Sequence, residues 1–210
     1  MIRSYGELDD MQIDVLRELG NIGAGNAATS LSAMINEGVR ISVPEVKILD
    51  YDKAITEIGE PEDLGIAVML QYSGDVRGII LFMLGTDDAK NIGEVLMGRM
   101  QDVDAAEESQ ISELKLSMIK EFGNILGCSY LNSIAMMTGL KFEVSVPYIS
   151  IDMVGAILST PLLLFSIDNS KIMLIEEVFL TEPHDLTSHV ILFADIPSLN
   201  TIFNRLGLNV

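Results

Sequence analysis

A repeat within the chain constrains its fold more than any other feature. The sequence Glu-Leu-Gly-Asn-Ile at residues 18–22 returns as Glu-Phe-Gly-Asn-Ile at residues 121–125, and Ser-Val-Pro at residues 42–44 returns at residues 145–147. Both recurrences have the same offset of 103 residues. Fixed spacing of this kind is the signature of duplicated structure.

The complete pattern is Asp/Ser-x3-Glu-x2-Asn-x22-Pro, with Asp14 and Ser117 at its first position. From average residue frequencies, two chance copies have a probability of roughly 1 in 100,000. We therefore interpret the chain as a duplication with repeats at about residues 9–98 and 105–208, forming a single domain over residues 1–210.

Each repeat is expected to begin with a long amphipathic helix. Asp9 and Asp104 can act as N-caps, with Gln12 and Glu107 three residues later completing a signal that resembles a capping box. Apolar residues spaced i, i+4 and i+7 predict a core-facing stripe: Val15, Leu19 and Ile22 in the first repeat, and Met118, Phe122 and Ile125 in the second. The glycines that we expect to end these helices are Gly38 and Gly139.

Runs rich in Val, Ile, Leu and Phe follow each expected helix and predict strands. They cover residues 40–49, 66–72 and 78–84 in the first repeat, and 142–151, 162–167, 172–180 and 188–194 in the second. Turns are expected at residues 74–75 and 169–170, short closing helices at 87–97 and 198–206, and an acidic connection at 99–108. The predicted class is α+β: a pseudo-twofold duplicated domain whose two long helices pack on a shared, mostly antiparallel sheet, because neither half has enough strands to bury its apolar face alone.

Composition excludes several classes of function. The net charge of −18 disfavours nucleic acid and anionic membrane surfaces as partners. The longest uncharged stretch, residues 153–167, contains Pro161 and is shorter than the ~20 residues of a spanning helix, so we expect no membrane insertion. The N-terminal residues lack an apolar signal region, which favours a cytoplasmic protein.

Metal and cysteine chemistry are also disfavoured. Cys128 is the only cysteine, so the chain has no internal disulfide or cysteine-based zinc cluster, and we expect this thiol to fill space in the core. His184 and His189 are five residues apart, the wrong spacing for one helical face, and no nucleophile signature lies near them. Asp9, Asp10 and Asp14 could bind a divalent ion, but we interpret them as a solvated acidic first turn.

The repeated polar residues share one face of each expected helix. At 100° per residue, a single stripe holds Asp14, Glu18, Asn21 and Gly25 in the first repeat, and Ser117, Glu121, Asn124 and Cys128 in the second. We call these sets the first and second polar stripes. A lone Glu-x-x-Asn would indicate only a solvated face, but duplication favours a function.

Glycines inside the expected helices need an explanation of their own, because each costs about 1 kcal/mol relative to alanine. They are Gly20, Gly23, Gly25, Gly123 and Gly127. One interpretation is close packing of the helices, and the other is close approach of a partner to the Asn. The sequence leaves both open. The methionines Met136, Met137 and Met153 are interpreted as core residues.

The doubled motif resembles the CheC/CheX/FliY family of chemotaxis phosphatases, which act on the phosphorylated aspartate of the response regulator CheY. Two complete motifs resemble the CheC type most, because CheX-like members carry one motif and FliY-like members append a flagellar switch domain. The resemblance places the catalytic pairs on Glu18 with Asn21 and on Glu121 with Asn124. It further implies a CheD-like deamidase as partner, with Asp152 at that contact.

The implied chemistry is hydrolysis of an acyl phosphate by in-line attack of water. The regulator would supply Mg²⁺ and a lysine, so the phosphatase needs no metal or cofactor of its own. A carboxamide on a rigid helix can position the water, while the glutamate anchors the regulator. We expect a monomer. The alternatives are a non-catalytic adaptor that binds the phosphorylated regulator or the deamidase, and a structural component of the flagellar switch.

Overall fold

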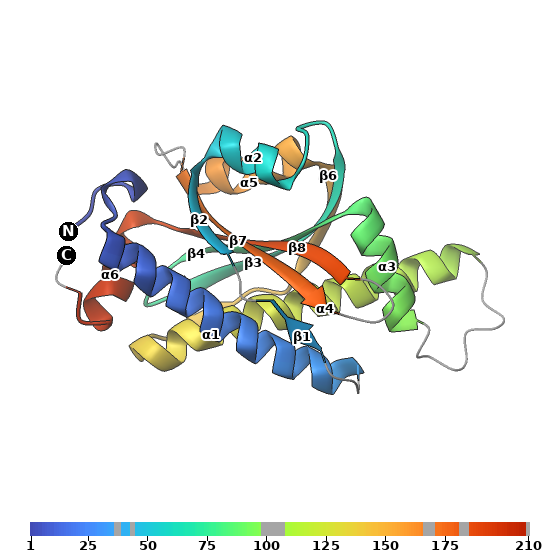
Figure 1. Ribbon diagram of the computed structural model, residues 1–210, viewed down its shortest axis with the longest axis horizontal. Helices are drawn as coiled ribbons and strands as arrows, with labels where there is room; N and C mark the ends of the chain where they lie inside the picture. The colour runs from blue at the N-terminus through green and yellow to red at the C-terminus, as the bar shows by residue number, and fades with distance from the viewer. Residues whose placement is uncertain (36–38, 43–44, 98–107, 166–170, 181–184, 209–210) are drawn as a thin grey trace.

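Three layers make up the protein (Figure 1). The computed structural model describes residues 1–35, 39–42, 45–97, 108–165, 171–180 and 185–208. Two long helices, α1 (Asp10–Ile35) and α4 (Glu108–Thr138), cover one face of a central sheet. The shorter helices α2 (Tyr51–Ile58) and α5 (Val154–Phe165) cover the other face.

The two halves have the same order of elements, which repeats as helix, two strands, helix, two strands, helix. The first half continues from α1 through β1 (Arg40–Ile41), β2 (Glu45–Asp50), α2, β3 (Leu64–Gly74) and β4 (Gly78–Gly85) to α3 (Thr86–Met97). The second continues from α4 through β5 (Phe142–Val144), β6 (Tyr148–Met153), α5, β7 (Lys171–Leu180) and β8 (Asp185–Ala194) to α6 (Ile196–Arg205). A 3₁₀ turn, η1 (Tyr5–Glu7), precedes α1.

Strand pairing joins the halves into one antiparallel sheet. Its order is β1-β7-β8-β4-β3-β5, with β2 also on β7 and β6 also on β3. Each half therefore lends a strand to the other, since β2 pairs with β7 and β6 with β3. The central β4–β8 pair, with Leu81 opposite Ile191, closes the pseudo-twofold arrangement. The predicted duplication and shared sheet are confirmed.

The central strands are buried on both faces, which explains their nearly continuous apolar sequence. Ile80 and Phe82 of β4 pack with the layer of α1 and α4. Ile79, Leu81 and Met83 pack with the layer of α2 and α5. Burial of an apolar side chain contributes about 1.5–3 kcal/mol, so two apolar clusters stabilise the sheet from opposite sides.

Local signals at the helix ends are borne out where the structure describes them. The Gln12 N–H donates to Asp9 Oδ1 (2.8 Å) and the Asp9 N–H donates to Gln12 Oε1 (3.0 Å), a reciprocal capping box. Gly139 follows α4 with φ +69°, the left-handed conformation that glycine adopts without strain. Asp104, Glu107, Gly38 and residues 99–107 of the expected connection lie outside the described residues, whereas Glu108, the last residue of that connection, begins α4.

Three strand predictions are corrected. Residues 40–49 and 142–151, each expected as one strand, form two strands apiece, β1 with β2 and β5 with β6. Residues 162–165, expected to begin a strand, belong to α5, which contains Pro161. A short apolar run has no period that distinguishes a strand from a helix, and α5 is apolar except at Ser159 and Thr160. The turn expected at 169–170 lies outside the described residues.

Close packing accounts for most of the helix glycines. A Cβ on Gly23 would lie 2.3 Å from the Tyr130 ring, and one on Gly123 would lie 2.6 Å from Val68. A Cβ on Gly127 would lie 2.3 Å from Leu70, and one on Gly20 would lie 3.0 Å from Val46. A Cβ on Gly25 would meet nothing within 4 Å, so Gly25 alone among these five is left without a packing explanation.

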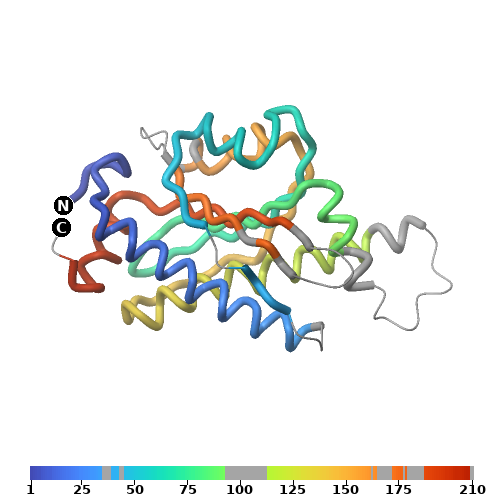
Figure 2. Tube along the Cα trace, in the orientation of Figure 1, coloured from blue at the N-terminus to red at the C-terminus, as the bar shows by residue number. Residues whose placement is uncertain are grey.

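The two chain ends lie side by side at one end of the molecule (Figure 2). The backbone of Ile2 and the side chain of Asn200 in α6 form two hydrogen bonds of 2.9 Å each. The Tyr5 hydroxyl donates to the Ala194 carbonyl at 2.8 Å. These bonds connect the first residues to the last strand and helix. Within the described residues, no helix has the length and apolar character needed to cross a bilayer.

Candidate functional site

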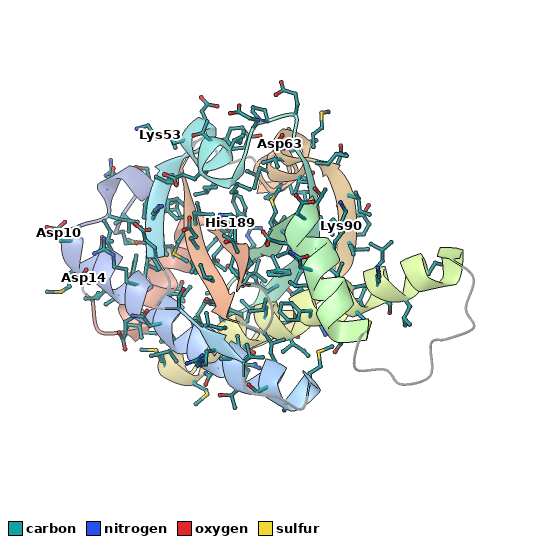
Figure 3. The ribbon with its side chains drawn as sticks, turned by 45° about the vertical axis from the view of Figure 1, so that its right-hand side comes forward. Asp10, Asp14, Lys53, Asp63, Lys90 and His189 are labelled. Carbon is teal, nitrogen blue, oxygen red and sulfur yellow. The ribbon has the colours of Figure 1, made fainter. Side chains whose placement is uncertain are left out.

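The first polar stripe lies on the exposed face of α1. Asp14, Glu18 and Asn21 are all exposed, whereas Leu19, between Glu18 and Asn21, is buried in the core. Asp14 projects away from the body of the molecule (Figure 3) and forms an ion pair with Arg17 at 2.8 Å. Both partners are more than half exposed, so this pair orders the surface and contributes little stability.

The second polar stripe lies on α4 and is more enclosed. Ser117 and Glu121 are exposed, but Asn124 is half-buried. The Cys128 thiol donates to Asn124 Oδ1 at an Sγ–Oδ1 distance of 3.6 Å. The expectation that Cys128 only fills core space is therefore wrong: the side chain is half-buried and contacts a stripe residue. The i, i+4 spacing of the two residues was the available signal.

The two stripes are related by the antiparallel packing of α1 against α4. The Asn26 amide donates to Ser133 Oγ at 2.9 Å, and Ser129 Oγ lies 3.5 Å from Ser30 Oγ. These two contacts exchange under the 103-residue offset, which places the pseudo-twofold axis near residues 28 and 131. Asn21 and Asn124 each precede the axis by seven residues, so they lie roughly 20 Å apart along the helix pair.

The chemistry available on each stripe is that of one carboxylate and one carboxamide. Among the described residues, no group of three His, Cys, Asp or Glu side chains is arranged to hold a metal ion, so the acidic start of α1 gains no support as a cation site. A carboxylate can pair with a cation of a partner, and a carboxamide can both donate and accept hydrogen bonds. Such a pair suits positioning rather than covalent catalysis.

Three hollows of the described surface lie away from both stripes. One of about 290 Å³ is at the start of α3 and includes Asp63, Asp87 and Asp88. Two others, of about 370 and 380 Å³, flank Arg77. Small ligands generally occupy concave sites, whereas the stripes are exposed helix faces. The stripes therefore suit contact with another macromolecule.

The remaining candidates are distributed elsewhere. Asp152 is exposed on β6, which among the described strands pairs only with β3. Met136, Met137 and Met153 are 81%, 39% and 45% exposed, so the interpretation of these methionines as core residues is wrong. Met136 and Met137 lie at the end of α4, beyond the sheet contacts that bury Gly123 and Gly127.

His189 is a buried residue of β8, and His184 lies outside the described residues. The His189 imidazole faces the layer of α2 and α5, with Nε2 3.8 Å from Glu176 (Figure 3). Lys47 Nζ pairs with Glu57 at 3.1 Å and with Glu176 at 3.9 Å. Burial, and then the Lys47 ammonium, lower the pKa of His189 to about 4, against the opposing effect of Glu57. The imidazole is thus neutral at neutral pH and distant from both stripes.

This histidine makes stability depend on pH in a definite window. Because its pKa is about 4 in the folded protein and 6.5 when exposed, the unfolded state takes up the proton first as pH falls. We expect the free energy of unfolding to drop by up to about 3 kcal/mol between pH 6.5 and pH 4 from this group. Chemical denaturation at a series of pH values in that range should show that the free energy of unfolding changes less with pH in His189→Gln than in the parent protein. An equal slope in the variant would assign the effect to other groups.

Parts of the sequence are similar to a known protein family and to individual proteins. Residues 11–48 and 114–151 match the model of the CheC-like family, and the two matches are separated by the same 103 residues. Over 209 residues, the chain is 29% identical to "CheY-P phosphatase CheC" of Bacillus subtilis, covering 98% of this chain and 99% of the relative. It is 28% identical over 150 residues to "Flagellar motor switch phosphatase FliY" of Bacillus subtilis, covering 71% of this chain and 38% of that relative.

Solved structures share the fold. Thermotoga maritima FliY superposes with a TM-score of 0.74 at 20% identity, covering 96% of this chain and 98% of the other. A chain of the CheX–CheY–BeF3–Mg²⁺ complex from Borrelia burgdorferi gives 0.51 at 14% identity, with coverages of 82% and 94%.

Fold and motifs together define a class: duplicated α+β proteins in which two packed helices each display a Glu-x-x-Asn motif. The two matched ranges, residues 11–48 and 114–151, each contain one complete copy of that motif. This chain is similar to the CheC-like family over these two ranges.

Proposed function

We propose that the protein is a phosphatase that hydrolyses the phosphorylated aspartate of a CheY response regulator. The observation that carries the proposal is that packed helices display two repeat-related Glu-x-x-Asn pairs, both with an exposed glutamate and with an asparagine that is exposed in α1 and half-buried in α4. The relative named CheY-P phosphatase CheC, similar over 98% of this chain, supports the same activity.

In the proposed mechanism, the carboxamide of Asn21 or Asn124 holds a water molecule in line with the phosphorus atom. The regulator supplies Mg²⁺ and a lysine, which offset charge on the phosphoryl group as the bond to the aspartate breaks. Glu18 or Glu121 pairs with that lysine and fixes the register of docking. No covalent intermediate forms on this chain, and its contribution is the orientation of water and the exclusion of unproductive poses.

Packing behind the stripes supports a positioning mechanism. Gly20 brings α1 against β2, and Gly123 brings α4 against β3, each on the side of the helix opposite the solvent. A carboxamide mounted on a helix fixed in this way loses little orientational freedom when the regulator docks. This close packing offsets the cost of about 1 kcal/mol that each glycine imposes on its helix.

A direct assay tests the proposal. The loss of radiolabelled phosphate from phosphorylated CheY is followed with and without the protein at micromolar concentration. We expect clear acceleration over the spontaneous rate. Absence of acceleration, with binding of the phosphorylated regulator retained, would instead support the adaptor hypothesis, in which the protein acts by sequestration.

A second surface favours a partner other than the regulator. Tyr148, Ile151 and Met153 of β6 are 62%, 52% and 45% exposed, and Asp152 lies among them. Because β6 pairs with β3 alone, its other edge is open to a partner within the described sheet. We propose that this edge binds a CheD-like deamidase, with Asp152 as its charged contact.

The expected result for Asp152→Lys is a loss of deamidase affinity of about tenfold or more, because the charge at the contact is reversed. Calorimetric titration of a purified CheD homologue measures it. Glu143→Lys, which makes the same change at an exposed position of β5, is the matched control. Equal affinities for the Asp152 variant and the parent protein would remove Asp152 from the contact.

A further inference from the structure

The two polar stripes differ at their fourth position. Gly25 of the first stripe and Cys128 of the second are equivalent under the 103-residue offset, and each follows its asparagine by four residues. A Cβ on Gly25 would meet nothing within 4 Å, so the surface beside Asn21 is open. The Cys128 thiol instead donates to Oδ1 of Asn124 at 3.6 Å.

The surroundings of the two carboxamides differ accordingly. Asn124 is half-buried and Asn21 is exposed. Within the described residues, the structure gives no side-chain hydrogen bond to Asn21, whereas Asn124 has the one from Cys128. One amide is therefore restrained by a neighbour on its own helix, and the other is free to change rotamer.

We propose that Cys128 is a positioning residue of the second site, where its thiol holds the amide oxygen of Asn124 and so selects one orientation of the carboxamide. The inference rests on the proposed phosphatase function and deepens it. With Oδ1 engaged, the two N–H bonds of the amide remain available to a water or phosphoryl oxygen. The first site lacks this restraint, because Gly25 has no side chain to supply it.

The thiol stays a donor under ordinary conditions. Burial, and then the Glu121 carboxylate, raise the pKa of Cys128 above its usual value. The protonated form therefore persists at neutral pH. No bond to sulfur forms or breaks in the proposed role.

A restraint on the carboxamide acts on turnover rather than on docking. Each site has its own anchoring glutamate, Glu18 in the first and Glu121 in the second. We therefore expect the two sites to bind the regulator with similar affinity. Orientation of the water is what the thiol improves. Its removal should lower kcat and leave KM for phosphorylated CheY unchanged.

Single-site proteins allow the test. Asn21→Ala leaves only the second site, and in that background we expect Cys128→Ala to lower kcat by roughly three- to tenfold with KM unchanged. Cys128→Ser, which keeps a donor at the same position, should restore most of the loss. Asn124→Ala leaves only the first site, and there Gly25→Cys should raise kcat, while the matched control Gly25→Ala should not.

The same variants test the positioning role of Cys128 and the phosphatase function separately. An Asn21→Ala protein that retains Cys128 and releases no phosphate faster than the spontaneous rate would contradict the phosphatase assignment of the second site. If that protein is active and Cys128→Ala leaves kcat unchanged, the positioning role is overturned and the phosphatase function stands. The role is equally overturned if the alanine and serine variants lose the same activity, or if Gly25→Cys matches Gly25→Ala.

Discussion

Replacement of both stripe asparagines, Asn21→Ala with Asn124→Ala, is expected to lower the protein-dependent rate of CheY dephosphorylation by at least about 100-fold. A polar contact made in the transition state is worth about 3 kcal/mol, which corresponds to that factor. Each single variant should retain the activity of the other site, because the two asparagines lie roughly 20 Å apart along the helix pair. Phosphate release from radiolabelled CheY measures all three proteins.

The matched control for the double variant is Asn132→Ala. Asn132 is an exposed asparagine of α4, two turns beyond Asn124, and it belongs to neither Glu-x-x-Asn pair. We expect it to keep the parental rate. Full activity in the double variant would remove both asparagines from the chemistry, even if the protein proved to be a phosphatase.

Among the glycine substitutions, the largest loss of stability is expected from Gly23→Ala. The new Cβ would lie 2.3, 2.6 and 2.9 Å from three atoms of the Tyr130 ring, which is buried between α1 and α4. Overpacking of this kind costs typically 1–3 kcal/mol or more, against a gain of about 1 kcal/mol in helix propensity. Because a whole buried ring must move, we expect a net loss of about 2 kcal/mol in the free energy of unfolding, measured by chemical denaturation.

Gly25→Ala is the matched control on the same helix. Nothing lies within 4 Å of its new Cβ, so the helix gain is unopposed and the protein should become more stable by up to about 1 kcal/mol. A difference in sign between two glycines only two residues apart would establish that α1 packs on α4 through Gly23. Equal effects of the two substitutions would contradict that packing.

The repeat explains how much of the fold could be predicted. The offset of 103 residues applies without change from α1 to β2 and α2, whose counterparts are α4, β6 and the start of α5. The long helices and the shared sheet therefore followed from the sequence. The layer of α2 and α5 did not, because the almost wholly apolar sequence of α5 has no helical period to detect.

A signal for that second layer was nevertheless present in the strands. Residues 79–84 of β4 are apolar without interruption, and all six are buried. A strand with one solvated face would alternate between polar and apolar residues, so this run requires cover on both sides. The absence of polar–apolar alternation in this strand indicated three layers, whereas the helix sequences did not.

The polar stripes could be predicted because a helix fixes which residues share a face. The exposure of Glu18 and Glu121 follows from the helical period, which places both outside the apolar stripe of their helix. The contact between Cys128 and Asn124 required side-chain geometry, since the same spacing fits a buried cysteine equally well. The exposed methionines at the end of α4 were missed for a related reason, because their burial depends on where the sheet ends.

The central claim is that a carboxamide on each of two symmetry-related helices reaches the phosphoryl group of the regulator. A crystal structure of this protein with CheY activated by beryllofluoride and Mg²⁺ tests it most directly. We expect a regulator docked on α1 or α4 with the amide of Asn21 or Asn124 within about 3 Å of a water or fluorine at the modified aspartate. A regulator bound at β6, with both amides far from the aspartate, would contradict it.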